Sequence, residues 1–381
     1  MFRVVPQNVN INFAGKQKTF LSISVVVVFI CLVILSVKSL KFGTDFSGGT
    51  EIQVRVADSI KIKQVREALA ETAGRGLGTA EVQNFGTAKN GEHDFLVKVE
   101  KTSLIQPQES EAIKANLVEK YGKDLRYEFN PDSDKIELRI AKDETEADFR
   151  TFIEAQSPKL KDAKIIKTLH LGKTEFLVSP KGVSAVLSDI LKKNLSTDVK
   201  VLRVDFVGAK VGRELRDNGI LSVIVTIGLI LFYIALRFDF YFAPGAVLAL
   251  VHDVAITVGI FSLLQKEFNL PTVAAILTIV GYSLNDTVVV FDRIRDNQTR
   301  FKGKSLSQIV NTSINETLSR TILTSVTTLV VVLVLFFFGG GIIHDFSFAL
   351  LIGVMVGTYS SIFIASPVFV MLKDRFEGQK S

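Results

Sequence analysis

An apolar run that begins near Pro271 closes with Gly281-Tyr282-Ser283-Leu284-Asn285-Asp286-Thr287-Val288-Val289-Val290-Phe291-Asp292-Arg293-Ile294-Arg295. A helix over residues 271–292 is long enough to cross a bilayer, because about 20 helical residues span the ~30 Å hydrocarbon layer. Asp286 then lies inside the membrane, about two helical turns before Arg293. An ionisable side chain at this depth costs about 2.5–3.5 kcal/mol on insertion scales and is usually functional. Asp286 is therefore a candidate functional residue; the alternative is an acid near a helix end that reaches the interface.

The composition indicates a membrane protein with a soluble part. Hydrophobic residues make up 48% of the 381 positions and gather in blocks. The net charge of +6 comes mainly from loops beside these blocks, which favours a role in membrane topology over nucleic-acid binding. The single cysteine, Cys31, lies in an apolar block, so the soluble part needs no disulfide. The histidines lack metal-ligand spacing, and we expect no metal and no cofactor; they are His93, His170, His252 and His344.

Six apolar blocks are long enough to span a membrane. The first block follows a short polar terminus, and it lacks the small-x-small pattern at which a signal peptide is cleaved. We therefore expect it to remain as a transmembrane helix rather than to be removed. The six predicted spans cover residues 20–38, 220–236, 241–264, 271–292, 321–338 and 346–372.

Positive charge alternates between the loops that join these spans. Lys and Arg residues occur in the N-terminal segment, in the loop between the fourth and fifth spans, and after the last span. By the positive-inside rule, both termini are then cytoplasmic and the soluble domain lies outside. This predicts a cytoplasmic segment 1–19, an outer domain between the first two spans, helices two to six within 219–372, and a cytoplasmic end 373–381.

The outer domain has an internal repeat. The alternating pattern of residues 52–56 recurs in residues 136–140, and residues 93–97 resemble residues 174–178. A helical pattern and a closing strand follow in each copy, which gives the order strand–helix–strand–strand–helix–strand twice. We predict two ferredoxin-like βαββαβ units, at 39–130 and 131–215, with the helix and closing strand of each copy at 109–120 and 124–129, and at 182–194 and 199–207. Neither unit contains a grouping of nucleophile and base, so a binding or moving module is expected.

A polar stripe begins the fifth span. Arg320, Thr324 and Thr328 are spaced four residues apart and share one helical face. Such a face must contact protein or water, because lipid offers these groups no partners. Arg320 has a depth similar to that of Asp286 on the preceding antiparallel span, so a charge pair between them is geometrically plausible. For the threonines alone, hydrogen bonding to their own helix is the simpler interpretation.

Further polar groups occur within the spans. His252 and Asp253 lie near the middle of the third span, and Asn285 lies beside Asp286. With Thr324 and Thr328 they are candidates for a proton relay, although His252 and Asp253 could equally form a structural polar contact. In the last span, two small residues four apart predict close helix packing, and a proline predicts a kink; these residues are Gly353, Gly357 and Pro367.

Several motifs together resemble the SecF family of bacterial protein-export subunits, which belongs to the SecD/SecF family and the resistance–nodulation–division (RND) superfamily. The first motif, beside the first span, contains Asp45, Phe46, Gly48, Gly49 and Thr50. The others are Val82-Gln83-Asn84-Phe85-Gly86, Val204-Asp205-Phe206-Val207-Gly208, the stretch 281–295, Arg320-Thr321-Ile322-Leu323-Thr324-Ser325 and Gly357-Thr358-Tyr359-Ser360-Ser361.

The resemblance implies an RND-like bundle of six transmembrane helices in the bacterial inner membrane, with an α+β periplasmic domain. Members of this family pair with SecD and join the SecYEG channel. They use the proton motive force to draw preproteins out of the channel, and they are not enzymes. Asp286 and Arg320 match the positions that the family uses for proton transport. The second outer unit departs from the family pattern of a single unit. Membrane lipid is an expected partner, and nucleic acid is not.

Two other functions remain open at this stage. One is a small-molecule or lipid exporter of the same superfamily, which usually has a second six-span half in the same chain. The other is a non-conducting scaffold for membrane protein insertion. Gly48, Gly49 and Gly208 lie near the membrane junctions of the outer domain. They are candidates for hinges, or they simply permit tight turns.

Overall fold

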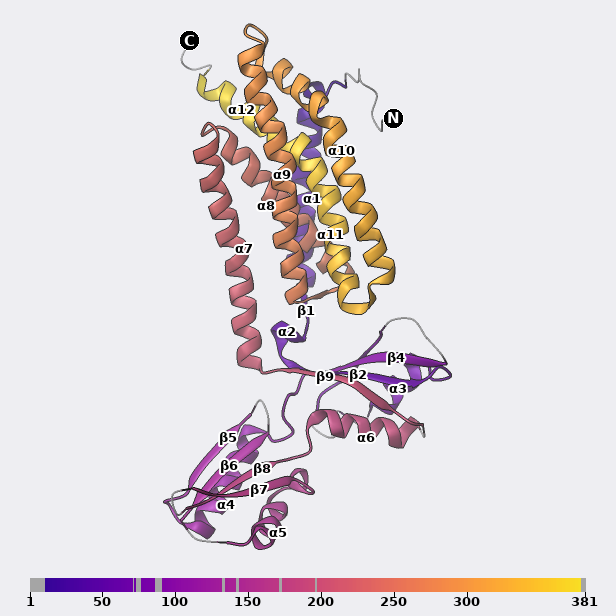
Figure 1. Ribbon diagram of the computed structural model, residues 1–381, viewed down its shortest axis with the longest axis vertical. Helices are drawn as coiled ribbons and strands as arrows, with labels where there is room; N and C mark the ends of the chain where they lie inside the picture. The colour runs from indigo at the N-terminus through magenta and orange to yellow at the C-terminus, as the bar shows by residue number, and fades with distance from the viewer. Residues whose placement is uncertain are drawn as a thin grey trace. The chain divides into compact units, whose positions relative to one another are not determined.

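The computed structural model describes residues 11–70, 72, 77–85, 91–131, 134–141, 144–170, 173–195 and 197–377. The chain forms two compact units (Figure 1). The helical unit contains Met1–Phe42 and Arg216–Ser381, and the α+β unit contains Gly43–Leu215. Gly86 of the predicted motif lies outside the described part. Of the four histidines, His170 is described only by its backbone.

The described residues include six helices that are long and apolar enough to cross a membrane, as predicted. The first follows a short 3₁₀ turn, Ala14–Lys16, and the last is interrupted by a π-helical turn, Ser361–Ala365. The regular helices of these spans are α1 (Gln17–Lys38), α7 (Ala209–Arg237), α8 (Phe242–Leu264), α9 (Leu270–Arg300), α10 (Leu306–Phe338), α11 (Gly340–Ser360) and α12 (Ser366–Glu377). The chain is thus a multi-pass membrane protein.

Local sequence signals explain where the key helices begin. Asn269 caps α9 by accepting a hydrogen bond from the backbone N–H of Thr272, with Pro271 in the first turn. Ser305 caps α10 in the same way, through the N–H of Gln308. In the last span the regular α-helix is interrupted just upstream of Pro367, by the π-helical turn. Such turns are frequent at functional sites.

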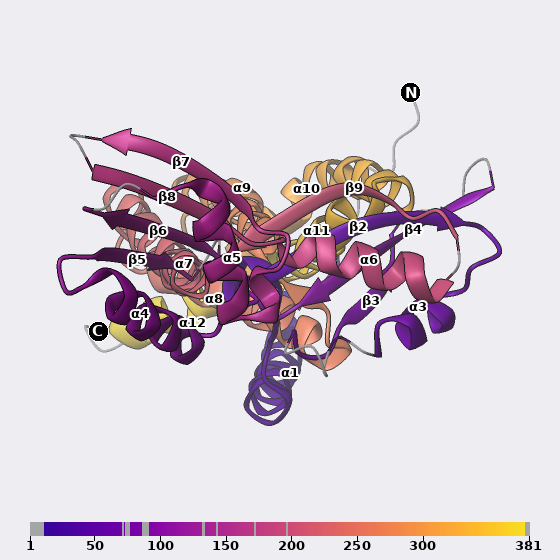
Figure 2. The ribbon, with the colours of Figure 1, turned by 90° about the horizontal axis from the view of Figure 1, so that it is seen from below.

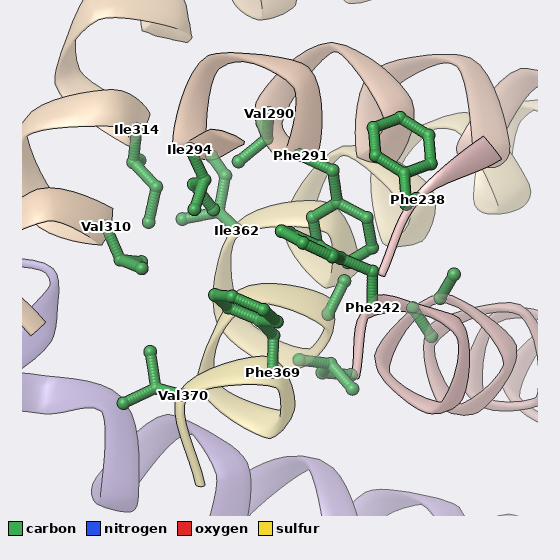
Figure 3. Packing of buried hydrophobic residues seen from close by; sticks show 14 of the residues in the cluster. Phe238, Phe242, Val290, Phe291, Ile294, Val310, Ile314, Ile362, Phe369 and Val370 are labelled. Carbon is green, nitrogen blue, oxygen red and sulfur yellow. The ribbon is translucent and has the colours of Figure 1, made fainter. Parts of the chain in front are cut away.

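A cluster of aromatic side chains joins the helices at one end of the bundle (Figure 3). The ring of Phe242 on α8 stacks on Phe369 of α12, with 3.9 Å between the ring centroids. It also lies 4.8 Å from the ring of Phe291 on α9. All three are fully buried. Aromatic pairs of this kind contribute about 0.5–1.5 kcal/mol beyond the burial of their surface, so they fix α8, α9 and α12 together.

The α+β unit contains two four-stranded antiparallel sheets. The first sheet has the order β3-β4-β2-β9, and its core is completed by α3 and α6. The second sheet has the order β5-β6-β8-β7, and its core is completed by α4 and α5 (Figure 2). The elements are α2 (Thr44–Ser47), β2 (Gly49–Ala57), α3 (Ile62–Ala68), β3 (Glu81–Asn84), β4 (Glu92–Val99), α4 (Pro107–Tyr121), β5 (Arg126–Asn130), β6 (Lys135–Ile140), α5 (Glu146–Gln156), the 3₁₀ turn Pro158–Leu160, β7 (Lys164–His170), β8 (Lys173–Ser179), α6 (Val183–Leu195) and β9 (Lys200–Val207). A further short pair, β1 (Lys41–Phe42) and β10 (Glu267–Phe268), belongs to the helical unit.

The predicted boundary between two units at 130/131 is wrong. The helix and closing strand of each half complete the sheet of the other half: α4 and β5 join the second sheet, and α6 and β9 join the first. The first unit keeps the βαββαβ order, but the second unit is inserted between its β4 and α6. The second unit has the same spatial arrangement, but its chain begins with the helix and strand, α4 and β5, that correspond to α6 and β9 at the end of the first unit.

Loop length explains this exchange. Only residues 131–134 separate β5 from β6, and the two strands pair as a hairpin from Asn130 and Lys135 onward. A short hairpin closes at a low entropic cost, whereas β5 would need a long return to reach β2. The edge of β2 is then left for β9, which pairs with it from Gly49 and Val207.

Candidate functional site

Asp286 lies on the buried face of α9. Its side chain is 3% exposed, and two polar neighbours are buried on the same face: Ser283, three residues earlier, and Thr287, four residues after Ser283. The spacing of three and four residues explains why these polar groups share a face that points into the bundle. Asn285 lies on another face and is exposed. The structure therefore does not bring Asn285 into the buried polar group, although the sequence places it beside Asp286.

The surroundings of Asp286 come from α10 and α11. The Ser325 hydroxyl and the positive charge of Arg320 both act on the Asp286 carboxyl. Ser325 Oγ also lies 2.7 Å from Thr358 Oγ1 of α11. Asp286 Oδ2 is buried and has no hydrogen-bond partner in the described part of the chain. One oxygen of this carboxyl is thus open to accept a proton.

Arg320 and Asp286 are near each other but do not form a closed ion pair. No contact within 4 Å joins them among the described ion pairs, and Arg320 is exposed. The structure therefore does not show the predicted ion pair, and the charge of Arg320 acts on Asp286 from beyond contact distance. Thr324, one turn from Arg320, donates to the carbonyl oxygens of Arg320 and Thr321, each at 3.0 Å. Thr324 thus hydrogen-bonds to its own helix, which is the simpler interpretation predicted from the sequence. Thr328 is half-buried farther along the same helix.

A second buried carboxylate, Asp253 on α8, lies where three spans meet. Asp253 Oδ1 is 2.9 Å from His252 Nδ1. Its Oδ2 accepts hydrogen bonds from Ser283 Oγ of α9 at 2.6 Å and from Ser360 Oγ of α11 at 2.8 Å. The Asp253 side chain is 1% exposed. The two predicted relay residues of α8 are therefore in contact, and Asp253 connects them to the serine that lies one turn before Asp286.

Small residues on α11 allow this close approach. A Cβ at Gly353 would overlap the side chain of Ile279, and one at Gly357 would lie 3.0 Å from Ser283 Cβ and 3.5 Å from Asp253 Oδ2. The two glycines are thus paired with two residues of α9 that are also four apart. Gly353 and Gly357 form the predicted close-packing face, and the partner helix is α9.

Another polar chain extends from His252 toward α1. The His252 ring stacks against Tyr359, with 6.1 Å between centroids. Tyr359 Oη lies 2.9 Å from Ser24 Oγ and donates to the carbonyl oxygen of Phe20. His252 Nε2 is buried without a hydrogen-bond partner among the described residues. The polar groups of the bundle thus involve α1, α8, α9, α10 and α11.

Four contact residues of this site were not predicted as site residues: Ser283, Ser325, Thr358 and Ser360. Each is a hydroxyl within an otherwise apolar span, and such a hydroxyl usually bonds to its own helix. The available signal was the run of polar residues from Thr358 to Ser361, which is too polar for a face that meets lipid.

The motif that follows the first span forms a tight turn. Gly48 and Gly49 have φ values of +77° and +128°, which side chains rarely adopt. A Cβ at Gly48 would meet the backbone of Ala209, and one at Gly49 would meet the carbonyl oxygen of Val99. Phe46 is buried, and Thr50 Oγ1 donates to the carbonyl oxygen of Lys101 at 2.8 Å. These features support the turn interpretation of the two glycines; Gly208 has no positive φ.

The chain matches two family models. Residues 186–375 match "Protein export membrane protein SecD/SecF, C-terminal", and residues 33–60 match the "SecD/SecF GG Motif". The second match contains Gly48 and Gly49.

Similar proteins were found over nearly the whole chain. The protein translocase subunit SecF of Rickettsia typhi is 33% identical over 378 residues, which cover 99% of this chain and 97% of that protein. The subunit SecF of Koribacter versatilis is 35% identical over 391 residues, which cover 97% and 93%. Among solved structures, SecDF of Thermus thermophilus, a translocon-associated membrane protein, has a TM-score of 0.64 at 30% identity. This chain spans 40% of the SecDF chain, and 98% of its own length is covered.

Proposed function

The chain belongs to the SecD/SecF family of protein-export membrane proteins, and we propose that it acts as the SecF-type subunit of a Sec export machine. It works with a SecD chain, and together they assist the SecYEG channel in moving preproteins across the bacterial inner membrane. The Thermus protein SecDF, of which this chain matches 40%, supports a SecD-type partner for this chain. The α+β unit lies on the periplasmic side, both termini are cytoplasmic, and lipid surrounds the six spans. The subunit moves protons and catalyses no covalent step.

The buried carboxyl of Asp286 carries this proposal. Its Oδ2 is free of hydrogen bonds in the described part of the chain, while Ser325 and the charge of Arg320 act on the carboxyl. A proton that enters from the outer side binds Asp286 and cancels its attraction to Arg320. Loss of that attraction lets α9 and α10 adjust, and release to the cytoplasm restores it. His252, Asp253, Thr324, Thr328 and Asn285 are the candidate relay residues named by the sequence.

The energy available from one proton is sufficient for such a step. A charge that crosses the membrane releases about 2.3 kcal/mol per 100 mV, before any pH gradient is counted. A two-state equilibrium whose states differ by a few kcal/mol is strongly shifted by that amount. The α+β unit is the part of the chain that would respond and contact the preprotein.

Asp286→Asn tests the proposal, because an amide cannot carry the proton. We expect this variant to lose the part of export that a protonophore abolishes, and Arg320→Lys to reduce it, since the compact and strongly hydrated charge of lysine does not take the position of the guanidinium charge. The assay uses sealed inverted vesicles that contain SecYEG, the SecD-type chain and the variant. Asp296→Asn is the matched control: it is the same change on the same helix at an exposed side chain, and it should export normally.

Full protonophore-sensitive export by both Asp286→Asn and Arg320→Lys would contradict the proton-driven role and favour a non-conducting scaffold. Failure of the native chain to co-purify with a SecD-type chain would instead favour an exporter of small molecules or lipids.

A further inference from the structure

Asp253 and Asp286 differ in how their oxygens are used. Both oxygens of Asp253 are engaged: Oδ1 by His252, and Oδ2 by two serine hydroxyls. Asp286, in contrast, has one buried oxygen without a partner among the described residues. An acid that exchanges protons needs an open position, whereas an acid that holds helices together needs several donors. The two carboxyl groups are therefore suited to different tasks.

The serine donors to Asp253 come from α9, which carries Asp286, and from α11, which contacts the Ser325 side chain beside Asp286. Ser283 lies on α9, three residues before Asp286 and thus one turn away. Ser360 is the last residue of α11, and the π-helical turn begins at the next residue. Thr358, two residues before Ser360, contacts Ser325, which in turn reaches Asp286. Hydrogen bonds to Asp253 thus fix the segments of α9 and α11 that place Asp286 and its Ser325 partner.

The groups that face Asp253 are few and defined. They are the hydroxyl of Ser283 on α9, the hydroxyl of Ser360 on α11, and the imidazole of His252 on α8, the helix that carries Asp253. Gly357 leaves the space in which Ser283 approaches α11. A buried carboxylate that loses such donors is left unsatisfied, so the arrangement favours one closed geometry of the three helices.

We propose that Asp253 is a positioning residue for Asp286: it joins α8, α9 and α11 through Ser283 and Ser360 and so sets the position of the Asp286 carboxyl. This role rests on the proposed proton-carrying function of Asp286. It assigns no proton transfer to Asp253 itself. Its chemical requirement is a hydrogen-bond acceptor at this place and not a titrating acid.

Substitutions of Asp253 separate positioning from relay. In Asp253→Asn the amide oxygen still accepts from both serines, and the amide N–H donates to His252 Nδ1 once the imidazole takes its other tautomer. Asp253→Val removes all three hydrogen bonds at similar volume. We expect Asp253→Asn to keep protonophore-sensitive export within about threefold of the native chain and Asp253→Val to lose it roughly a hundredfold, because small displacements at a reacting group have effects of that size.

A second variant does not alter the acid. Ser283→Ala combined with Ser360→Ala removes the two donors from α9 and α11, and we expect roughly a tenfold loss of protonophore-sensitive export. The matched control is Thr257→Val, one turn along α8. Thr257 is fully buried, but within the described part of the chain its hydroxyl bonds only to its own helix, at the carbonyl oxygen of Asp253. This control should export normally, with the same amount of chain in the membrane and the same thermal midpoint in detergent.

The outcomes are distinct. If Asp253→Asn loses as much export as Asp253→Val, Asp253 is a proton carrier and the positioning role is overturned. Normal export by the double serine variant overturns it as well, even where Asp253→Val fails to reach the membrane. If Asp286→Asn exports normally in the same vesicles, the proposed function itself is wrong. If Asp286→Asn fails while Asp253→Val and the double variant export normally, only the positioning role is wrong.

Discussion

Gly353 on α11 lies where this helix contacts α9, and a Cβ there would overlap the side chain of Ile279. Gly353→Ala therefore forces Ile279 out of its rotamer or separates the helices. Overpacking of this kind costs about 1–3 kcal/mol. We expect a lower thermal unfolding midpoint for the purified chain in detergent.

The matched control for this prediction is Gly281→Ala on α9, where an added Cβ has nothing within 4 Å. This change should leave the midpoint unchanged or raise it, since alanine favours a helix more than glycine does. Equal midpoints for the two variants would mean that α9 and α11 do not touch at Gly353.

Asp94 makes the stability of the first sheet depend on pH. Hydrogen bonds from Arg55 lower the pKa of the Asp94 carboxyl more than its partial burial raises it, and Gln53 adds a further hydrogen bond that lowers it. Because the pKa is lower in the folded state, the stabilisation is present above the unfolded value of about 3.9 and is lost as the pH falls through the folded value. The β2 and β4 amides in the full chain should therefore lose protection from hydrogen exchange as the pH falls through the folded pKa of Asp94. This loss should be larger than the loss at amides elsewhere in the chain.

Asp94→Asn provides the comparison. Near neutral pH its β2 and β4 amides should exchange faster than those of the native chain, and below the folded pKa of Asp94 the two chains should converge. A difference that persists unchanged down to pH ~2, well below the unfolded value, would show that the charge of Asp94 is not what protects the sheet.

Which site residues a sequence reveals depends on what makes each of them unusual. Asp286 and Asp253 are visible because a carboxyl in an apolar run is costly and therefore rare. Ser325 and Ser360 are not visible, since a single hydroxyl in a span normally bonds to its own helix. Their role depends on which faces of α8, α9 and α11 meet, which is tertiary information. Asn285 illustrates the opposite error, because it neighbours Asp286 in sequence and lies on an exposed face.

At the scale of elements, each sheet of the α+β unit has its own hydrophobic core. Helix α4 and strand β5 belong to the second sheet, and α6 and β9 belong to the first. The core of the first sheet takes its buried residues from positions 52–104 and 183–199, and the core of the second takes them from positions 105–178. Replacing residues 105–180 by a short Gly/Ser linker should therefore leave the first sheet folded. Limited proteolysis of the full-length membrane protein should still give a resistant fragment that contains β2, β4 and β9.

A deletion of residues 131–207 is the matched comparison, because it follows the repeat seen in the sequence. It removes β9 and α6 from the first sheet and β6 to β8 from the second, so both cores should become sensitive to protease. If both deletions gave equally resistant first sheets, β9 would not be the strand that completes that sheet.

The strands and helices of this unit follow from their periodicity, but their partners do not. Alternation in residues 52–56 and 136–140 marks two half-buried strands without stating which strand lies beside each. Residues 131–134 form a connection short enough for a hairpin, and this was the signal that β5 pairs forward with β6. The repeat predicted two units that follow one another in the sequence. The short connection instead pairs β5 with β6, which assigns β5 to the second sheet.

At the scale of the whole molecule, the spans differ in how much protein surrounds them. In the apolar stretch of each span, only 11% of the residues are buried in α1 and in α7, against 50% in α8 and in α9. The exposed residues of α1 and α7 are large and apolar, such as Phe29 and Phe232. Lipid is the environment in which such surfaces are stable. The interior spans α8 and α9 carry the polar groups, which need protein partners.

Cysteine labelling tests the proposed orientation. The native Cys31 is buried and packs against Gly259, so Cys31→Ala gives a cysteine-free background. In intact cells with a permeable outer membrane, a membrane-impermeant maleimide should label Asp189→Cys on α6 and should not label Lys302→Cys between α9 and α10. Labelling of Lys302→Cys in the intact cells would place that loop on the outer side and reverse the topology.

The sequence of the second sheet is inserted within the sequence of the first, and this also determines the order in which the nascent chain can fold. Because β4 ends at Val99 and β9 begins at Lys200, the whole second sheet emerges during synthesis before the first sheet has its fourth strand. The inserted module can therefore finish folding while the edge of β2 is still unpaired. An unpaired strand edge is a template for adventitious pairing with other chains, so the first sheet is exposed to such pairing throughout this interval.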